Sequence, residues 1–365
     1  MPPLTRPAPS CITCLARVVR SVRALRPAGL RALAVLPLLL ASLLPAHVLA
    51  GADPARLDYQ LAARALAPGV WVVEGTNADF SPANGCNIIN TGFIATGAGV
   101  LVINTGPSKR YGEQLRALIG RTTREPVVGV LHLNLHPDYF LGNQAFADVP
   151  RYASSATREG MAREFKAYED NLYRLCGDWM LGTETLLPDQ GLPAAVPGAA
   201  GSAITRVTGA RWRLGEREFL LHEASGHTAS DLVLVERRSG IAFVGGLVFV
   251  DRIPTTPHAR IDSWLASLER LQTLAQDDGL QLLVPSHGPV RAGTAGIAQT
   301  RAYLRWLDVN FSSRAREGWE MSEVLRAPPP APYASWAAVK TEYVRNVAHL
   351  YPGYERRALA PSTPR

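Results

Sequence analysis

The sequence predicts an α/β fold in which two β-sheets pack face to face and helices cover the outside. Two observations predict it. Strand-like runs of β-branched residues occur in two successive halves of the chain, and each half closes with helical periodicity. Four stretches rich in histidine or glycine stand at the ends of these strands, where loops usually carry function. A chain of 365 residues is long enough for one large domain of this class or two small ones.

The first fifty residues predict a secretory signal peptide. They contain six arginines and no acidic residue, followed by an apolar run over residues 32–44 and by small residues before position 51. We expect cleavage near Ala50 and a periplasmic mature protein. A permanent N-terminal anchor is the alternative, but the apolar run is shorter than the ~20 residues that a membrane span needs.

Removal of this leader changes the charge and the cysteine count. Lys plus Arg falls from 38 to 32 against 31 acidic residues, so the mature net charge is +1 and no basic stripe suggests a nucleic-acid partner. Cys11 and Cys14 leave with the leader. Cys86 and Cys176 remain, and in an exported protein they form either one disulfide or two separate buried thiols.

The first half of the mature chain predicts strand, strand pair, helix and strand. Residues 56–66 are expected as a helical or loop segment within a lead-in over residues 51–68. The predicted strands are 69–75, 87–96, 100–104 and 126–130, and the predicted helix is 111–119.

The second half follows a long helical region and a loop rich in proline and glycine. The helical region covers 156–180 and the loop 187–202; the strands are a hairpin over 210–224, then 231–236, 240–245 and 281–285, with a helix at 261–276 between the last two. Helices at 294–310 and 336–350 end the chain. We therefore predict a main domain over 69–292, a C-terminal helical extension over 293–357, and a disordered tail over 358–365.

The candidate site begins where the strand at 126–130 ends. His136 and Asp138 stand two residues apart at this strand exit, so both can face one cation, and imidazole and carboxylate are zinc ligands. Here the chain resembles the metallo-β-lactamase superfamily, whose signature is His-x-His-x-Asp-His. The corresponding residues are Asn134, His136, Asp138 and Tyr139, so two of the four positions are altered.

Three later stretches resemble further motifs of the superfamily, in the same order. They are Gly226-His227-Thr228, Gly245-Gly246 with Phe249, and Ser286-His287-Gly288. The resemblance implies the αββα fold, a first metal at Asn134, His136 and His227, and a second at Asp138, Tyr139 and His287. Gly246 replaces the aspartate that bridges two metals in the family.

This metal motif is degenerate. Asn134 offers only a neutral carbonyl oxygen, Gly246 offers nothing, and Tyr139 would have to bind as a phenolate, which is costly because its reference pKa is near ~10. Four donors remain: His136, Asp138, His227 and His287. We expect them to hold one zinc ion, with Asp138 as ligand or general base; the alternative is that they are hydrogen-bonded in a polar cleft without metal.

Two other histidines and one arginine lie near the candidate site in the sequence. His132 shares a strand face with Asn134 and is expected to be a core histidine. Arg252 and His258 follow the strand end that carries Gly246, so we expect them over the cleft, where they would hold an anionic substrate, or else in a solvated turn.

A narrower resemblance is to the exported branch called quinoprotein relay system zinc metallohydrolases. It rests on residues 83–93, 171–180 and 251–258. It implies a periplasmic protein that serves a PQQ-dependent dehydrogenase or its cytochrome.

Three functions follow. The first is a metallo-β-lactamase-fold hydrolase-like protein with at most one zinc ion, in which metal-bound water attacks an ester or thioester of a small molecule and Asp138 accepts the proton. The second is a non-catalytic binding protein or accessory factor that uses the same cleft. The third is a docking scaffold built on C-terminal aromatic residues, namely Trp336, Tyr343 and Tyr351.

Overall fold

The structure is a computed structural model that describes residues 57–192 and 210–360. The predicted signal peptide, residues 193–202 of the predicted central loop, and residues 361–365 of the predicted tail lie outside the described residues.

Two six-stranded sheets form the centre of the described chain. The first has the order β1-β2-β3-β4-β5-β6 and the second β12-β11-β10-β9-β8-β7. The strands of the first sheet are β1 (Arg64–Ala67), β2 (Val70–Val73), β3 (Thr91–Ala95), β4 (Val100–Ile103), β5 (Val127–Leu131) and β6 (Arg151–Tyr152). Those of the second are β7 (Ala210–Leu214), β8 (Arg217–Ala224), β9 (Asp231–Glu236), β10 (Ile241–Phe249), β11 (Leu282–His287) and β12 (Arg291–Ala292). The pairs β4–β5, β5–β6 and β10–β11 are parallel and the others antiparallel.

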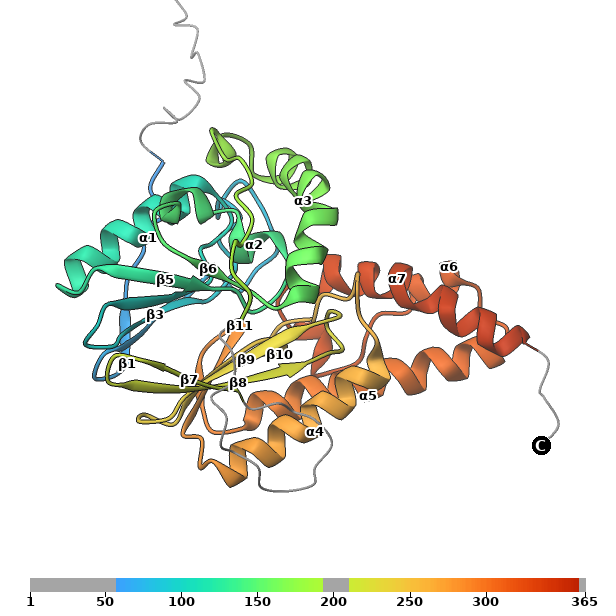
Figure 1. Cartoon of the computed structure of the whole chain (residues 1–365). Coiled ribbons are helices and arrows are strands. Elements are labelled where there is room, and N and C mark those ends of the chain that lie inside the picture. The colour runs from blue at the N-terminus through green and yellow to red at the C-terminus, as the bar shows by residue number, and fades with distance from the viewer. Residues whose placement is uncertain (1–56, 193–209, 361–365) are drawn as a thin grey trace, which may run out of the picture. The chain divides into compact units, whose positions relative to one another are not determined.

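The helices lie on the outer faces of the two sheets (Figure 1). Beside the first sheet lie α1 (Lys109–Thr122), α2 (Pro137–Phe140) and α3 (Ser155–Cys176), and beside the second lie α4 (Ile261–Asp277) and α5 (Ala295–Arg316). The chain ends in α6 (Met321–Arg326) and α7 (Val339–Leu359), and short 3-10 turns cover Asn143–Phe146, Gly177–Met180 and Tyr333–Ser335. None of the helices within residues 57–192 and 210–360 has the length and apolar character needed to cross a membrane.

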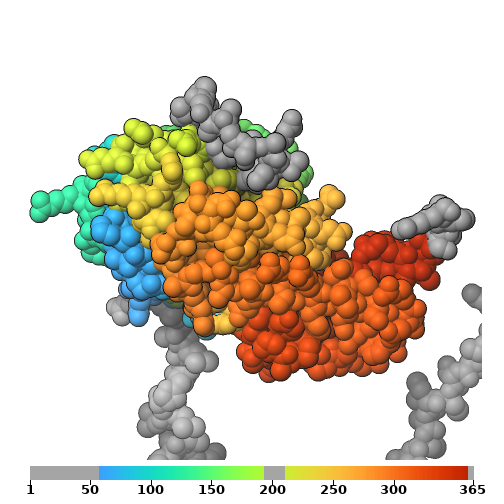
Figure 2. All heavy atoms as spheres, turned by 90° about the horizontal axis from the view of Figure 1, so that it is seen from below, coloured from blue at the N-terminus to red at the C-terminus, as the bar shows by residue number. Residues whose placement is uncertain are grey.

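Apolar packing explains this layering. Leu101, Ile103 and Leu131 of the first sheet face Leu234 and Phe243 of the second in one cluster. Burying this area stabilises the sandwich by about 25 cal/mol per Å² of apolar surface. A second cluster packs α1 on the first sheet, and a third packs α4, α5 and α7 on the second. The orange and red atoms of the C-terminal helices make up much of the face seen from below (Figure 2).

The predicted two-sheet α/β sandwich with helices outside is confirmed. One local prediction is wrong: residues Arg64–Ala67 form β1 rather than a helix or loop, because β2 beside them pairs with their backbone. Their sequence, Arg-Ala-Leu-Ala, has helical propensity that sheet pairing overrides. At the other end, α7 continues to Leu359, past the predicted start of a disordered tail at Ala358.

The aromatic residues of the scaffold hypothesis lie in the core. Trp336, Tyr343 and Tyr351 are 7%, 3% and 0% exposed, in the cluster that joins α5 and α7 to the second sheet. They pack helices together and present no surface to a partner.

Candidate functional site

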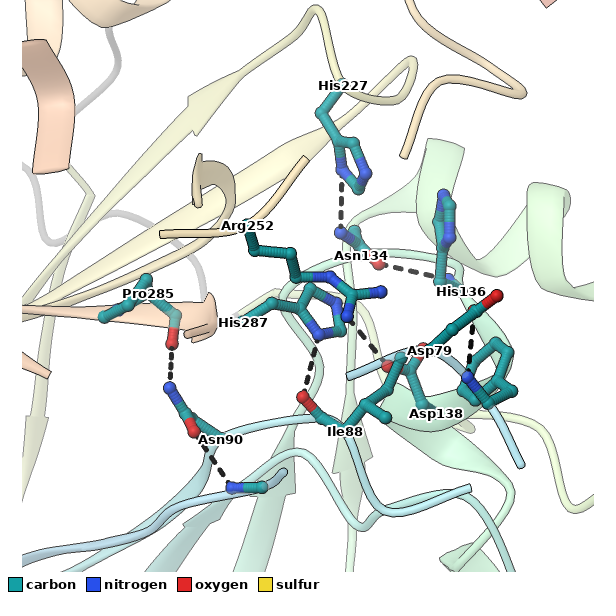
Figure 3. A network of polar contacts seen from close by, with 12 residues as sticks. Asp79, Ile88, Asn90, Asn134, His136, Asp138, His227, Arg252, Pro285 and His287 are labelled. Atoms are coloured by element: carbon teal, nitrogen blue, oxygen red, sulfur yellow. Dashed lines mark hydrogen bonds and ion pairs between the residues drawn. The ribbon is translucent and has the colours of Figure 1, made fainter. Parts of the chain in front are cut away.

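The predicted site residues meet where β5, β8 and β11 end and β9 begins, beside the last residues of β10 (residues 246–249) (Figure 3). After β5 the chain runs through Asn134 to His136, and Pro137 then starts α2. Proline suits the first position of a helix because its missing N–H would have no partner there. Asp138 follows in the first turn of this helix. The short helix thus fixes where His136 and Asp138 stand relative to each other.

Asn134 lies between two histidines, as Figure 3 shows. Its Oδ1 accepts a hydrogen bond from the backbone N–H of His136 at 3.0 Å, and its Nδ2 lies 3.3 Å from Nδ1 of His227. Both ends of the amide therefore point to protein atoms. Asn134 thus bridges the His136 backbone and the His227 ring, and its Oδ1 already accepts one hydrogen bond.

His227 is oriented by a carboxylate that the sequence analysis did not single out. Its Nδ1 lies 3.2 Å from Oδ1 of Asp231, and the other oxygen of Asp231 accepts the N–H of Thr228 at 2.8 Å. Since Asp231 is fully buried, this bond is protected from water. In the tautomer that carries the proton on Nδ1, His227 donates to Asp231 and keeps its lone pair on Nε2, and this buried Nε2 has no hydrogen-bond partner among the described residues.

His136 packs on His227 and beside His258. The rings of His136 and His227 stack with centroids 4.7 Å apart and planes 23° apart. His258 lies edge-on at 5.6 Å from His136, and its Nε2 is 3.1 Å from the hydroxyl of Tyr168 on α3. His258, which is half-buried, and Tyr168 therefore cover the outer side of His136.

Gly246 allows this packing. A Cβ atom at position 246 would lie 2.0 Å from Nδ1 of His227 and 2.8 Å from Nδ2 of Asn134. The place where a side chain would begin is already filled by His227 and Asn134, so an acidic side chain at Gly246 would force both to move.

Asp138 and His287 form the second half of the site. His287 Nδ1 donates to the carbonyl of Ile88 at 2.9 Å, and its Nε2 lies 3.5 Å from Oδ2 of Asp138. Burial raises the pKa of Asp138 to about 7, whereas burial and then the charge of Arg252 lower the pKa of His287 well below its usual value. Burial therefore favours the uncharged form of both groups, and they contact each other without a strong ion pair.

Tyr139 and His132 lie behind these residues, fully buried. Burial, followed by the charge of Asp138, raises the pKa of Tyr139 well above its usual value, so a phenolate ligand is disfavoured. His132 Nδ1 lies 3.1 Å from the carbonyl oxygen of Tyr139, which places His132 in the core as a structural histidine.

The donors as arranged do not fit a resident zinc ion. An open zinc site has three protein ligands whose donor atoms lie about 2.0–2.3 Å from one ion. His136 and His227 both have an unpaired Nε2, but lone pairs lie in the ring planes, and stacked rings do not aim them at one point. Over residues 57–192 and 210–360, no group of three or more His, Cys, Asp or Glu side chains is placed to hold a metal ion.

Arg252 was predicted over the cleft, and Cys86 was predicted either in a disulfide with Cys176 or as a separate buried thiol. Arg252 is 1% exposed and lies inside the protein rather than over an open cleft. Its guanidinium faces Glu342 of α7 at 3.8 Å. Cys86 is joined to Cys176 by a disulfide with a Cα–Cα distance of 5.9 Å, which ties the β2–β3 loop to the end of α3.

Sequence reasoning missed Asp231, Tyr168 and Glu342. Asp231 ends the stretch that begins at Gly226, and a carboxylate four residues after a candidate ligand was a usable signal. Tyr168 was noted only for its helical spacing. Glu342 stands 90 residues after Arg252, and no local pattern connects them.

Comparisons with known proteins agree with this fold. The family model described as "Metallo-beta-lactamase superfamily" matches residues 84–287, more than half of the chain, and the chain belongs to this superfamily. No curated protein matches the chain.

Solved structures of the same fold share little sequence with the chain. A metallo-beta-lactamase from Pontibacter korlensis is 22% identical with a TM-score of 0.51, over 67% of this chain and 99% of that one. One from Hirschia baltica is 20% identical with a TM-score of 0.50, over 67% and 97%. The metallo-beta-lactamase FIM-1 from Pseudomonas aeruginosa, in its mono-zinc form, is 17% identical with a TM-score of 0.50, over 67% and 95%. At these identities the likeness concerns the fold alone.

Proposed function

We propose that the chain is an exported, hydrolase-like member of the superfamily that works in the periplasm with a PQQ-dependent quinoprotein dehydrogenase system. The leader pattern of the first fifty residues supports export. The sequence resemblance at residues 83–93, 171–180 and 251–258 supports the quinoprotein system, with the dehydrogenase or its cytochrome as partner. The substrate is a small molecule with an ester or thioester bond.

One observation carries the hydrolytic proposal: His227 is oriented by Asp231 and keeps a free Nε2 beside His136. An imidazole whose Nδ1–H is held by a carboxylate is set to accept a proton at Nε2. A water molecule activated there would attack a carbonyl carbon. The bond from the carbonyl carbon to the alkoxide or thiolate would then break, and Asp138, whose pKa is raised to about 7, would give its proton to this leaving group and regain one when His227 releases the proton taken from water.

The proposal includes at most one zinc ion and assigns no step to it. Such an ion would polarise a carbonyl oxygen and lower the pKa of a bound water. It would need His136 or His227 to turn, since their stacked rings do not converge on one point.

Metal analysis of the mature protein, purified from periplasm without added metal or a histidine tag, tests this proposal together with an ester and thioester screen. We expect at most one zinc per chain, and we expect hydrolysis to fall at least tenfold in His227→Ala and in Asp231→Asn. His222→Gln is the matched control, because His222 lies in β8, outside the site. Two metals per chain, or full activity in His227→Ala, would contradict the proposal.

The second candidate is a binding protein or accessory factor of the same system that uses the same residues without turnover. Its support is the closure of the site, because the following side chains are each at most 9% exposed: Asn134, His136, Asp138, His227 and His287. Absence of turnover across the screen, together with binding of a small anion that His227→Ala removes, would favour this candidate.

A further inference from the structure

Arg252 carries a charge into the interior next to the site. It follows β10, is 1% exposed, and donates from one guanidinium nitrogen to the carbonyl of Ala78 in the β2–β3 loop. A guanidinium stays protonated in proteins, so this positive charge is permanent. Figure 3 shows the Arg252 side chain extending toward the half of the site that contains His287 and Asp138.

A buried carboxylate from the C-terminal extension faces this charge. Glu342 of α7 is 2% exposed, and its Oε1 lies 3.8 Å from Arg252 and 2.7 Å from Arg345. Arg345 in turn pairs with Asp79 at 3.1 Å. Two guanidinium groups and two carboxylates alternate, which balances the charges that folding removes from water.

The Arg252 charge acts on the Asp138–His287 half. One loop holds Arg252 and His287 together, since the carbonyl of Ala78 accepts from Arg252 and the carbonyl of Ile88 accepts from His287, and Figure 3 shows the guanidinium pointing to this half of the site. A divalent cation in the same place would meet a fixed positive charge at low dielectric, where repulsion between charges is strongest.

We infer that Arg252, which pairs with Glu342 of α7, provides the positive charge of the Asp138–His287 half of the site and prevents a divalent metal ion from binding there. The guanidinium supplies positive charge without a bound ion. This role does not depend on what reaction the protein performs.

The inference assigns part of the site to the C-terminal extension. The family match ends at residue 287, whereas Glu342 lies on α7. Arg252 also reaches α7 through the backbone, since it forms a bridge with Ala337 just before that helix. Without α7, the charge of Arg252 would have no carboxylate from this helix beside it.

Zinc titration of folded variants by calorimetry tests the inference. Arg252→Gln should bind zinc at least tenfold more tightly than the wild type, and adding Asp138→Asn to that variant should remove the gain. Arg252→Lys keeps a cation and should match the wild type. Arg217→Gln is the matched control, because Arg217 is also buried and pairs with Glu236 at 3.2 Å, outside the site.

A double variant protects the test against misfolding. Arg252→Gln removes one of the two arginine partners of Glu342. Arg252→Gln combined with Glu342→Gln removes both charges, so no buried carboxylate loses its partner. This double variant should still bind zinc more tightly than the wild type, with a smaller gain than Arg252→Gln because the negative charge of Glu342 is removed as well. Affinity within twofold of the wild type in a folded variant without Arg252, or a gain that persists with Asp138→Asn, would overturn the inference, whatever the ester screen shows.

Discussion

Gly246 lacks a side chain at the point where β10 meets His227 and Asn134. His227 and Asn134 come so close to its backbone that even a methyl group would overlap the imidazole ring. The side chains of His227 and Asn134 therefore fill the space that a side chain at position 246 would need.

Gly246→Ala should lower the free energy of unfolding by about 1–3 kcal/mol, because overpacking forces His227 and Asn134 to shift. Urea denaturation measures this. Gly120→Ala is the control, since Gly120 lies in α1 with no atom within 4 Å of a new Cβ, and alanine there should stabilise the helix by about 0.5–1 kcal/mol. Equal stability of Gly246→Ala and wild type would show that the site is looser than described.

Asp138 makes stability depend on pH in the direction opposite to an ordinary carboxylate. Its pKa is raised by burial from 3.8 to about 7, so between these pH values the folded protein holds a proton that the unfolded chain has released. This contribution to stability is full at low pH and falls as the pH rises toward 7.

The wild type should therefore lose about 2–3 kcal/mol of unfolding free energy, relative to Asp138→Asn, when the pH is raised from 5 to 8. Asparagine has no proton to lose, so the variant lacks this pH dependence. Chemical denaturation of both proteins at the two pH values gives the difference. The exposed Asp178→Asn variant serves as control. A difference that stays constant with pH would mean that Asp138 is ionised in the folded protein at pH 5.

The loop between β2 and β3 is the element that joins the two sheets at the site. The carbonyl of Ala78 accepts from Arg252, the carbonyl of Ile88 accepts from His287, and Asn90 donates to Pro285 and Gly288. The Cys86–Cys176 disulfide fixes this loop to α3, whose Tyr168 contacts His258.

Replacing both cysteines by serine should lower the free energy of unfolding by about 4 kcal/mol, because the bridge closes a long loop with a sequence separation of 90. Urea denaturation of the double variant and of each single variant measures the loss. The single variants should lose at least as much as the double. Unchanged stability in the double variant would mean that the bridge adds nothing to folding.

At the scale of the whole molecule, both sheets supply residues to the site, and α7 packs beside it. The β5 and α2 region supplies His136 and Asp138, and the second sheet supplies His227 and His287. The family match covers these four residues, but the counter-charge of Arg252 comes from α7, beyond it. The extension thus contributes both to the core and to the electrostatics of the site.

The sequence by itself determined the sandwich, since hydrophobic periodicity and strand-end motifs are local signals. It also predicted that His136, Asp138, His227 and His287 would lie near one another, because each follows or ends a strand, but it did not single out Asp231. The rest depended on contacts between distant segments. The stacking of His136 on His227 and the burial of Arg252 against Glu342 join residues that are about 90 positions apart in the chain. Local propensity and residue spacing do not encode contacts between distant segments, so only the tertiary structure decided them.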